Sequence, residues 1–274
     1  GRSLAIDATT LAHGVTVTRA ATADNFRLFD ITSGSELILR GLVLSNGVAQ
    51  GGSSLFGGGA LGAGGAMFNR GKLSLDRCTL TGHAAIGGYA RAIGNGAIGG
   101  GGVGASSSNS SGGGPNGGAE GSDSGFGGGG LGGDGGLGGG GGGGGWGFSG
   151  ANGGNAGTGG FGGGGGPGSQ GGLRSGGSGS DGGGGFGGGA ARGYGGSGAG
   201  MGGAVFNDAG TLTIRNSTFA GNTAKGGQQG YVAGYTGSGF GGAIFNYNGA
   251  LTIDFSTFVD NTTREGFLTA MNVS

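Results

Sequence analysis

The carboxylate side chains are the residues of this 274-residue chain that could most directly support catalysis. Cleavage of a polysaccharide by general acid–base chemistry, or with the help of calcium, needs several carboxylates that converge on one face. The aspartates in the repeated part of the sequence are Asp76, Asp208, Asp254 and Asp260. We expect them at different points of the repeat, and they never form an Asp-Asp or Asp-x-Asp cluster. This pattern disfavours a lyase or hydrolase, and we expect a protein that is not an enzyme.

The histidines and the cysteine offer as little chemistry as the aspartates. His13 and His83 have no neighbouring nucleophile, and we expect both in turns or at the surface. Cys78 is the only cysteine, so it can form neither an internal disulfide nor a cysteine-rich metal site. It aligns with Ser217 and Ser256 in the repeat, which indicates a small packed residue rather than a reactive thiol. No metal or cofactor is expected.

The composition excludes several classes of protein. Glycine accounts for 91 residues, but the chain has only two prolines, which rules out a collagen-like triple helix. Lysine and arginine together number 13, as do aspartate and glutamate, so the formal net charge is zero. We therefore expect no nucleic-acid partner and no membrane surface held by bulk charge. No window approaches the roughly 18 apolar residues that a membrane span needs.

An internal repeat organises the chain. Three copies of Gly-Gly-Ala-x-Phe-Asn stand at residues 64–69, 202–207 and 241–246, each followed by a second motif at 72–80, 211–219 and 250–258. A degenerate copy of the repeat covers residues 29–44, and a first turn of the coil is expected at residues 3–18. Apolar residues alternate in short segments, which predicts three short strands per copy. Rungs of about 20 residues predict an all-β fold, a short right-handed parallel β-helix (β-solenoid) of about five rungs.

Equivalent residues of successive rungs should stack about 4.8 Å apart. The columns expected to point inward are Phe68, Phe206 and Phe245; Leu73, Leu212 and Leu251; Leu75, Ile214 and Ile253; and Leu80, Phe219 and Phe258. Two asparagine ladders are expected at tight turns, one of Asn69, Asn207 and Asn246 and one of Asn222 and Asn261. In such ladders the stacked side-chain amides satisfy one another.

The repeat motifs resemble those of right-handed parallel β-helix surface proteins, especially chlamydial polymorphic outer membrane proteins and autotransporter-like adhesins. Residues 241–244 read Gly-Gly-Ala-Ile, and residues 219–222 and 258–261 fit Phe-x-x-Asn, the two tetrapeptides of that group. The resemblance covers the sequence on both sides of the glycine-rich segment. It implies the β-helix fold and a displayed or adhesive surface, although the same fold also carries polysaccharide-cleaving enzymes.

A glycine-rich insert divides the repeat. We expect β-helix rungs at 1–85, the insert at 86–201, and rungs of the same solenoid at 202–274, with all insertions at one corner of the coil. In the insert Leu131, Asp134 and Leu137 are three residues apart, the period of polyproline II. This favours a packed polyglycine II-type bundle, whereas the composition alone favours a flexible Gly/Ser linker. Its candidate contact residues are Trp146, Phe148, Phe161, Phe186 and Tyr194.

These observations favour a non-enzymatic extracellular protein of the cell surface. We expect a structural or adhesive role, as a subunit of a filament or matrix fibre whose main partner is another copy of itself, with a surface glycan or receptor as a further partner. The alternatives are a carbohydrate-binding or polysaccharide-cleaving β-helix protein and an ice-binding protein. For ice binding, Thr211 and Thr213 supply one pair, but the equivalent pairs are Lys72 with Ser74 and Ala250 with Thr252, so no threonine array is expected.

Overall fold

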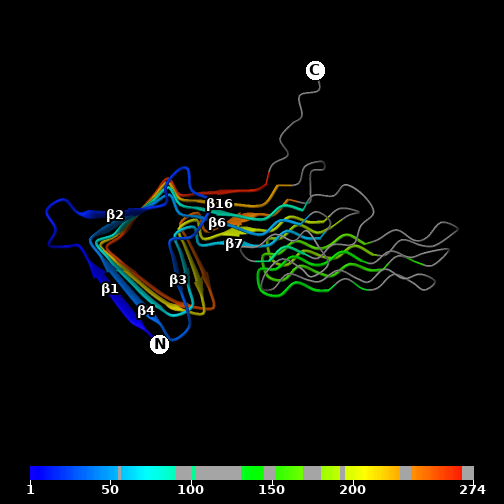
Figure 1. Cartoon of the computed structure of the whole chain (residues 1–274), viewed down its shortest axis with the longest axis horizontal. Helices are drawn as coiled ribbons and strands as arrows, with labels where there is room; N and C mark the ends of the chain where they lie inside the picture. Colours follow the sequence, from blue (N-terminus) through cyan, green and yellow to red (C-terminus); the bar gives the residue numbers. More distant parts are fainter. Residues whose placement is uncertain are drawn as a thin grey trace, which may run out of the picture.

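The computed structural model shows an all-β chain coiled into five stacked rungs, and the predicted β-solenoid is confirmed (Figure 1). It describes residues 1–54, 57–90, 100–102, 131, 133–144, 152, 154–168, 180–191, 195–228 and 236–266. The first described rung contains β1 (Ser3–Asp7) and β2 (Val15–Thr18). The second contains β3 (Phe29–Ile31), β4 (Glu36–Arg40), β5 (Leu42–Ser45), β6 (Val48–Gln50) and β7 (Gly62–Ala63).

The remaining rungs repeat this order of strands. The third contains β8 (Met67–Asn69), β9 (Lys72–Asp76), β10 (Thr79–Thr81), β11 (Ala84–Ile86) and β12 (Gly200–Met201). The fourth contains β13 (Val205–Asp208), β14 (Thr211–Arg215), β15 (Thr218–Ala220), β16 (Thr223–Lys225) and β17 (Gly239–Phe240). The fifth contains β18 (Ile244–Tyr247), β19 (Ala250–Asp254), β20 (Thr257–Val259) and β21 (Thr262–Arg264).

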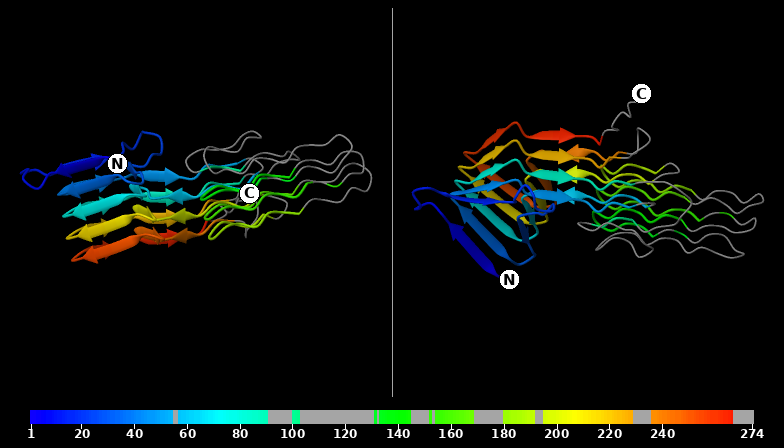
Figure 2. Two further views of the ribbon diagram at one scale, coloured as in Figure 1. Left: turned by 90° about the horizontal axis from the view of Figure 1, so that it is seen from below. Right: turned by 45° about the horizontal axis from the view of Figure 1, so that its top comes forward.

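Five parallel sheets run along the solenoid, each built from one strand per rung (Figure 2). Three of them enclose the interior: β1-β4-β9-β14-β19, β2-β5-β10-β15-β20 and β3-β8-β13-β18. The other two, β6-β11-β16-β21 and β7-β12-β17, lie where the chain leaves and re-enters the coil, and we call them the neck. The glycine-rich segments extend from the neck on one side of the solenoid (Figure 1).

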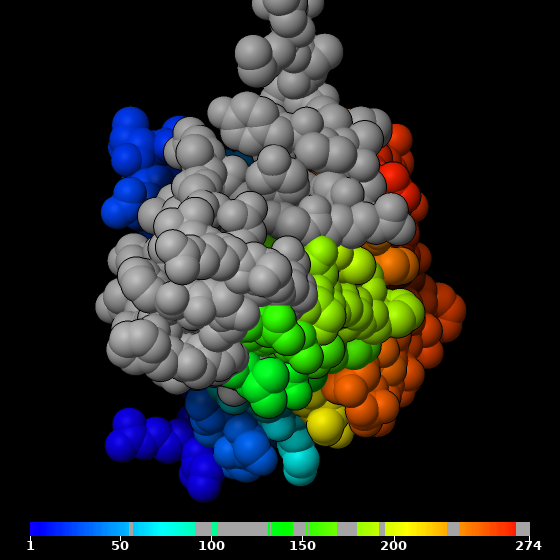
Figure 3. Space-filling model, turned by 90° about the vertical axis from the view of Figure 1, so that its right-hand side faces the viewer, coloured from blue at the N-terminus to red at the C-terminus, as the bar shows by residue number. Residues whose placement is uncertain are grey.

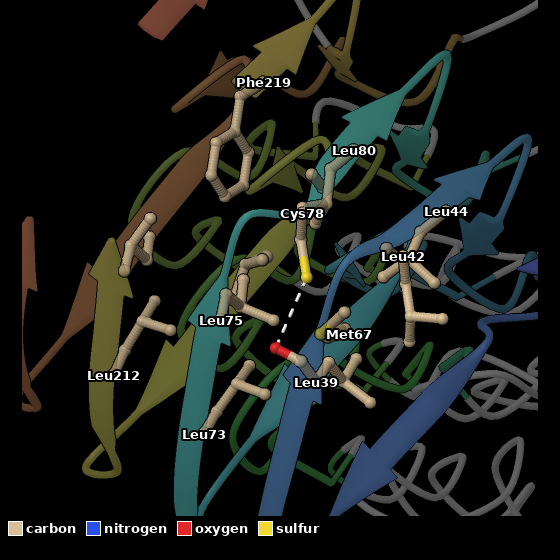
Figure 4. Close-up of a cluster of buried hydrophobic side chains, with 14 of the residues drawn as sticks. Leu39, Leu42, Leu44, Met67, Leu73, Leu75, Cys78, Leu80, Leu212 and Phe219 are labelled. Atoms are coloured by element: carbon tan, nitrogen blue, oxygen red, sulfur yellow. Dashed lines mark hydrogen bonds between the residues drawn. The ribbon is translucent and has the colours of Figure 1, made fainter. Parts of the chain in front are cut away.

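Aliphatic columns fill the interior. Leu39, Leu75 and Ile214 pair in register on successive strands, and each is 0% exposed. Leu80 and Phe219 form the next column, above Leu44 (Figure 4). Such columns arise because side chains alternate across a strand, so a strict in-register pairing brings like faces together from rung to rung. The repeat therefore builds one continuous core along the axis.

The corners of the coil are single residues in left-handed conformation, stacked above one another. The corner before the β5, β10, β15 and β20 strands is made by Gly41, Arg77, Asn216 and Phe255, with φ between 48° and 65°. Glycine adopts this conformation without strain, whereas a bulky residue does so at a cost of roughly 1–2 kcal/mol. The stacked pairing on both sides must stabilise the corner at Phe255.

The expected inward column of phenylalanines is wrong. Phe68, Phe206 and Phe245 do stack, but outside the interior, where they join a second apolar cluster. Val205 and the corresponding residues of β8 and β18 point inward instead. The reason is a break in alternation just before these residues: Ala204 and Val205 both face the core, and their amides both donate to the carbonyl of Ala243, so the faces are exchanged from Val205 on.

The rung also has more strands than the three predicted. The two-residue and three-residue strands of the neck are rich in glycine and alanine, so they carry no alternation of apolar residues. The predicted boundary between residues 85 and 86 falls inside β11, and the boundary after residue 201 follows β12. The three long connections all leave from β6, β11 and β16, which are neighbours in one sheet.

Candidate functional site

The neck is built by glycines that let two sheets approach closely. A Cβ added at Gly62 would collide with the carbonyl of Ile86, and one added at Gly200 would collide with the carbonyls of Lys225 and Ala85. The outgoing and incoming strands therefore pack backbone against backbone, which only glycine permits. This contact explains why a glycine-rich insert can leave and return at adjacent positions.

The described part of the insert is held together by backbone hydrogen bonds between neighbouring segments. Successive amides at residues 58–61, in the connection between β6 and β7, donate to three different segments: to the carbonyls of Gly138 and Gly141 in the first, of Gly196 in the second and of Gly52 in the third, over 2.7–2.9 Å. A β-strand bonds to two neighbours in one plane, whereas a polyproline II-like segment leaves all its amides free to bond outward in several directions. This pattern favours the predicted bundle over a flexible linker. Figure 3 shows the described segments, in green, packed against the C-terminal rungs.

Three turns of the bundle share one sequence and one geometry. Leu137, Phe161 and Phe186 are each preceded by two glycines and followed by two more. The glycine directly after each has a φ of 76°, and an amide-to-carbonyl bond of 2.7–2.9 Å closes the turn. This is the pattern of a type II turn, which requires a positive φ at its third residue. The large residue therefore stands at the second position of every turn.

The turns at Phe161 and Phe186 meet the solenoid in a cluster that we call the aromatic junction: Phe68, Phe206, Phe240, Phe245 and Tyr247 of the rungs with Phe161 and Phe186 of the insert. The ring of Phe161 lies 4.2 Å from that of Tyr247 and 5.3 Å from that of Phe186, measured between centroids. Phe186 lies 5.0 Å from Phe240. Aromatic pairs of this kind contribute about 0.5–1.5 kcal/mol each beyond their burial. The junction attaches the bundle to the outer face of the β13 sheet.

The candidate contact residues thus divide into two groups. Phe161 and Phe186 contact the chain's own solenoid, although Phe186 remains 55% exposed. Trp146, Phe148 and Tyr194 lie outside the described residues. The repeat motif could have identified part of this junction, because its Phe is the only large residue in Gly-Gly-Ala-x-Phe-Asn that the core does not use.

Two arginines cover the first ring of the phenylalanine stack. The guanidinium of Arg27 lies 5.1 Å from the centroid of Phe68, and that of Arg70 lies 5.3 Å from it. Arg27 also donates to the carbonyl of Ala63 at 2.7 Å and pairs with Asp30 at 3.5 Å. Burial lowers the pKa of Arg27, against the attraction of Asp30. This cation closes one end of the junction.

Both asparagine ladders are present as hydrogen-bonded side chains. Asn69 Nδ2 donates to Asn207 Oδ1 at 2.7 Å, and Asn207 Nδ2 donates to Asn246 Oδ1 at 2.6 Å. In the second ladder Asn222 Nδ2 donates to Asn261 Oδ1 at 2.8 Å. Asn69, Asn207 and Asn222 are fully buried, so these bonds satisfy amides that water cannot reach.

His83 extends the second ladder, which corrects the expectation of a surface histidine: its side chain is 1% exposed. Its Nδ1 accepts the amide of Gly47 at 2.9 Å, so the ring proton is on Nε2, which donates to the carbonyl of Leu44 at 3.0 Å. Asn222 makes the same bonds one rung on: its Nδ2 donates to the carbonyl of Leu80, and its Oδ1 accepts the amide of His83. Desolvation lowers the pKa of His83 to about 4.

Opposite charges alternate along the outer face of the β14 sheet. The column runs Asp7, Arg40, Asp76, Arg215, Asp254 in register. Arg40 pairs with Asp7 at 3.6 Å, and Arg215 pairs with Asp254 at 3.2 Å. Asp76 and Asp254 therefore occupy the same point of the rung, contrary to the sequence-based expectation. Because an arginine stands between them, they do not form the carboxylate pair that hydrolysis requires.

The fifth rung exposes side chains whose counterparts are buried one rung earlier. Leu251, Ile253 and Phe258 are 37%, 42% and 43% exposed. The residues stacked on them in the fourth rung, which are Leu212, Ile214 and Phe219, are all 0% exposed. The edges of β19 and β20 thus present unpaired backbone groups together with an apolar surface, within the described part of the chain.

A shallow groove lies at the corner between the β3 and β4 sheets. It has a volume of 490 Å³ and is lined by Arg2, Glu36, Arg70 and Lys72 among others. Arg70 is engaged by Asp30 at 3.3 Å, and Glu36 accepts from Ser3 at 3.1 Å. Among the described residues no group of three or more potential metal ligands occurs, and no helix has the length and hydropathy of a membrane span.

Comparison with protein-family models, curated proteins and solved structures finds no match to this chain.

Proposed function

We propose that this protein is a non-enzymatic structural or adhesive protein of the extracellular surface, whose copies associate end to end through the solenoid. The glycine bundle would then project from the side of the fibre at regular intervals. The location outside the cell and the kinship with β-helix surface proteins are part of the proposal. They are supported by the Gly-Gly-Ala-Ile and Phe-x-x-Asn motifs at residues 219–222, 241–244 and 258–261.

The apolar surface of the fifth rung carries the proposal. Leu251 and Ile253 continue a fully buried column but are themselves about 40% exposed. Burying such side chains is favourable by roughly 1.5–3 kcal/mol each when burial is complete. A surface that combines exposed core residues with an unpaired strand edge is a template for further strands.

The first described rung has a matching sequence. Residues 3–7 read Ser-Leu-Ala-Ile-Asp and residues 250–254 read Ala-Leu-Thr-Ile-Asp, and they form the two edges of the same parallel sheet. If β19 of one copy paired with β1 of the next in the register used inside the chain, Leu251 would meet Leu4 and Ile253 would meet Ile6. Leu4 is 54% exposed, so both sides of this contact have apolar surface to bury.

The same register opposes two carboxylates. Asp254 would lie over Asp7, because the alternating charge column begins and ends on aspartate. Like charges directly opposite each other on paired strands are destabilising. We therefore expect end-to-end association to be strengthened by salt, which screens this repulsion.

The experiment is sedimentation and electron microscopy of the 274-residue chain over a range of protein and salt concentrations. The expected result is linear particles that lengthen with concentration. Ile253→Asp should abolish them, whereas Thr252→Asp, on the outer face of the same strand, should preserve them. Unfolding temperatures of both variants test whether the solenoid stays folded. A wild-type chain that sediments as a monomer at every concentration would overturn the proposal.

A further inference from the structure

The outer face of the β2-β5-β10-β15-β20 sheet carries two straight rows of small hydroxyl and methyl side chains. The first row is Thr16, Val43, Thr79, Thr218 and Thr257, and the second is Thr18, Ser45, Thr81, Ala220 and Val259. We call these ten side chains the threonine face. All are exposed or half-buried, while the residues between the rows, such as Leu80 and Phe219, are buried in the core.

We propose that the threonine face binds ice. This proposal is independent of end-to-end association, because the face lies along the side of the solenoid and not at its ends.

The spacing of the face is regular in two directions. Strand pairing in register places successive members of a row about 4.8 Å apart, and two residues of one strand separate the rows by roughly 6.6 Å. Every neighbouring pair of rungs keeps this register on the sheet, without a bulge. The result is a two-dimensional grid of hydroxyl and methyl groups, and water molecules in the surface planes of ice repeat over distances of this order.

The threonine face is uncharged, as is the surface of ice. None of its ten positions carries a charge. The outer face of the neighbouring β14 sheet is different: it carries the column from Asp7 to Asp254 and the pair of Glu36 and Lys72, in register with each other. Charged groups hold water in their own hydration geometry, which a growing ice lattice would have to displace, whereas hydroxyl and methyl groups impose no such cost.

The side chains of the face are also held in place. Threonine and valine are branched at Cβ, which restricts χ1, so little conformational entropy is lost when they meet a rigid surface. On the opposite side of the sheet Leu44, Leu80 and Phe219 are each 0% exposed and keep the strands fixed. A preorganised, regular and uncharged face is what adsorption to a lattice requires.

The sequence-based expectation that no threonine array forms was drawn from Thr211 and Thr213, which lie on the charged sheet. The uncharged rows lie on the next sheet, in the segments that also contain the Leu80 and Phe219 column. Their second row mixes threonine with serine, alanine and valine, so only the register of the folded chain reveals it as a row.

Two variants of the fourth rung test the proposal. Thr218→Lys places a cation in the middle of the threonine face, and Thr213→Lys places the same cation on the neighbouring sheet, where Thr213 is also half-buried and points outward. The measurements are thermal hysteresis and inhibition of ice recrystallisation by the 274-residue chain. Unfolding temperatures of both variants show whether each remains folded.

We expect the wild-type chain and Thr213→Lys to show thermal hysteresis and Thr218→Lys to lose it. Absence of hysteresis in the wild-type chain, or equal loss in the two variants, would overturn the proposal. Retention on an insoluble neutral polysaccharide that only Thr218→Lys abolishes, without hysteresis in the wild type, would also overturn it and assign the face to carbohydrate.

Discussion

Replacing the buried histidine of the second ladder by asparagine should remove a specific loss of stability in acid. His83 is the one member of its ladder that can take up a proton, and its pKa in the folded chain is about 4 against an ordinary value of 6.5. Between pH 6.5 and about pH 4, His83 is protonated in the unfolded chain but neutral in the folded chain. The contribution to stability is therefore fully present above pH 6.5 and falls as the pH drops, until the loss is complete below about pH 4.

The size of the effect follows from the shift. A difference of about 2.5 pKa units corresponds to a loss of roughly 3 kcal/mol in the free energy of unfolding, at 1.36 kcal/mol per unit. Burial justifies the full value, because the side chain is 1% exposed. The main cause of the lowered pKa is desolvation of the buried ring. A protonated ring would also direct a second N–H at the amide of Gly47, which already donates to Nδ1 at 2.9 Å.

His83→Asn keeps the hydrogen-bonding pattern and removes the group that takes up a proton in acid. Asn222 and Asn261 show that an asparagine here can donate to the carbonyl above and accept the next amide. The variant should fold at pH 7 and lose about 3 kcal/mol less than the wild type between pH 7 and pH 4.

The assay is urea unfolding followed by circular dichroism at a series of pH values. Carboxylates titrate in the same range, but they do so equally in both proteins, so the difference between the two curves isolates the histidine. His13→Asn, an exposed position, is the matched control and should follow the wild type. If His83→Asn lost as much stability as the wild type between pH 6.5 and pH 4, the linkage to this ring would be refuted.

Three further outcomes are expected. Phe161→Ala should weaken the attachment of the glycine bundle by about 1 kcal/mol for each lost ring contact, beginning with Tyr247, and quicken its proteolysis; unchanged cleavage would count against the aromatic junction as the anchor. Phe255→Gly should raise the free energy of unfolding by roughly 1 kcal/mol, measured as a higher midpoint of urea unfolding, because Phe255 is 92% exposed and has a φ of 48°. Phe255→Ala keeps the Cβ and should bring no such gain. Asp254→Asn should promote end-to-end association at low salt by relieving the repulsion from Asp7, and sedimentation showing no change would argue against that register.

Much of the fold could be predicted because the repeat encodes its own register. Leu212 and Leu251 occupy the same place in two copies of one motif, and β14 and β19 pair them. In a solenoid, equivalent strands of successive rungs pair in register. Residues that align between copies of the repeat are therefore neighbours along the axis. The asparagine ladders followed from the same alignment.

The faces of the strands were harder to predict than their register. Phe206 is as apolar as any core residue, and its place outside the interior depends on the break between Ala204 and Val205, which moves the alternation by one residue. His83 gives no signal of burial by its own type, but the repeat aligns it with the ladder residues Asn222 and Asn261, and that alignment indicates its role. A break of one residue in the alternation changes which face of the strand is inside, and composition carries no record of it.

By itself the sequence determined which residues stack, where the rungs repeat and at which corner the insert leaves, because these depend on spacing along the chain. Only the tertiary structure decided that the phenylalanines face the insert and not the core, that the turns at Phe161 and Phe186 reach back to meet them, and that the threonines form rows on an uncharged face. Those outcomes depend on the direction of each side chain after a corner, and on segments that become neighbours only when the glycine backbone has closed its hydrogen bonds.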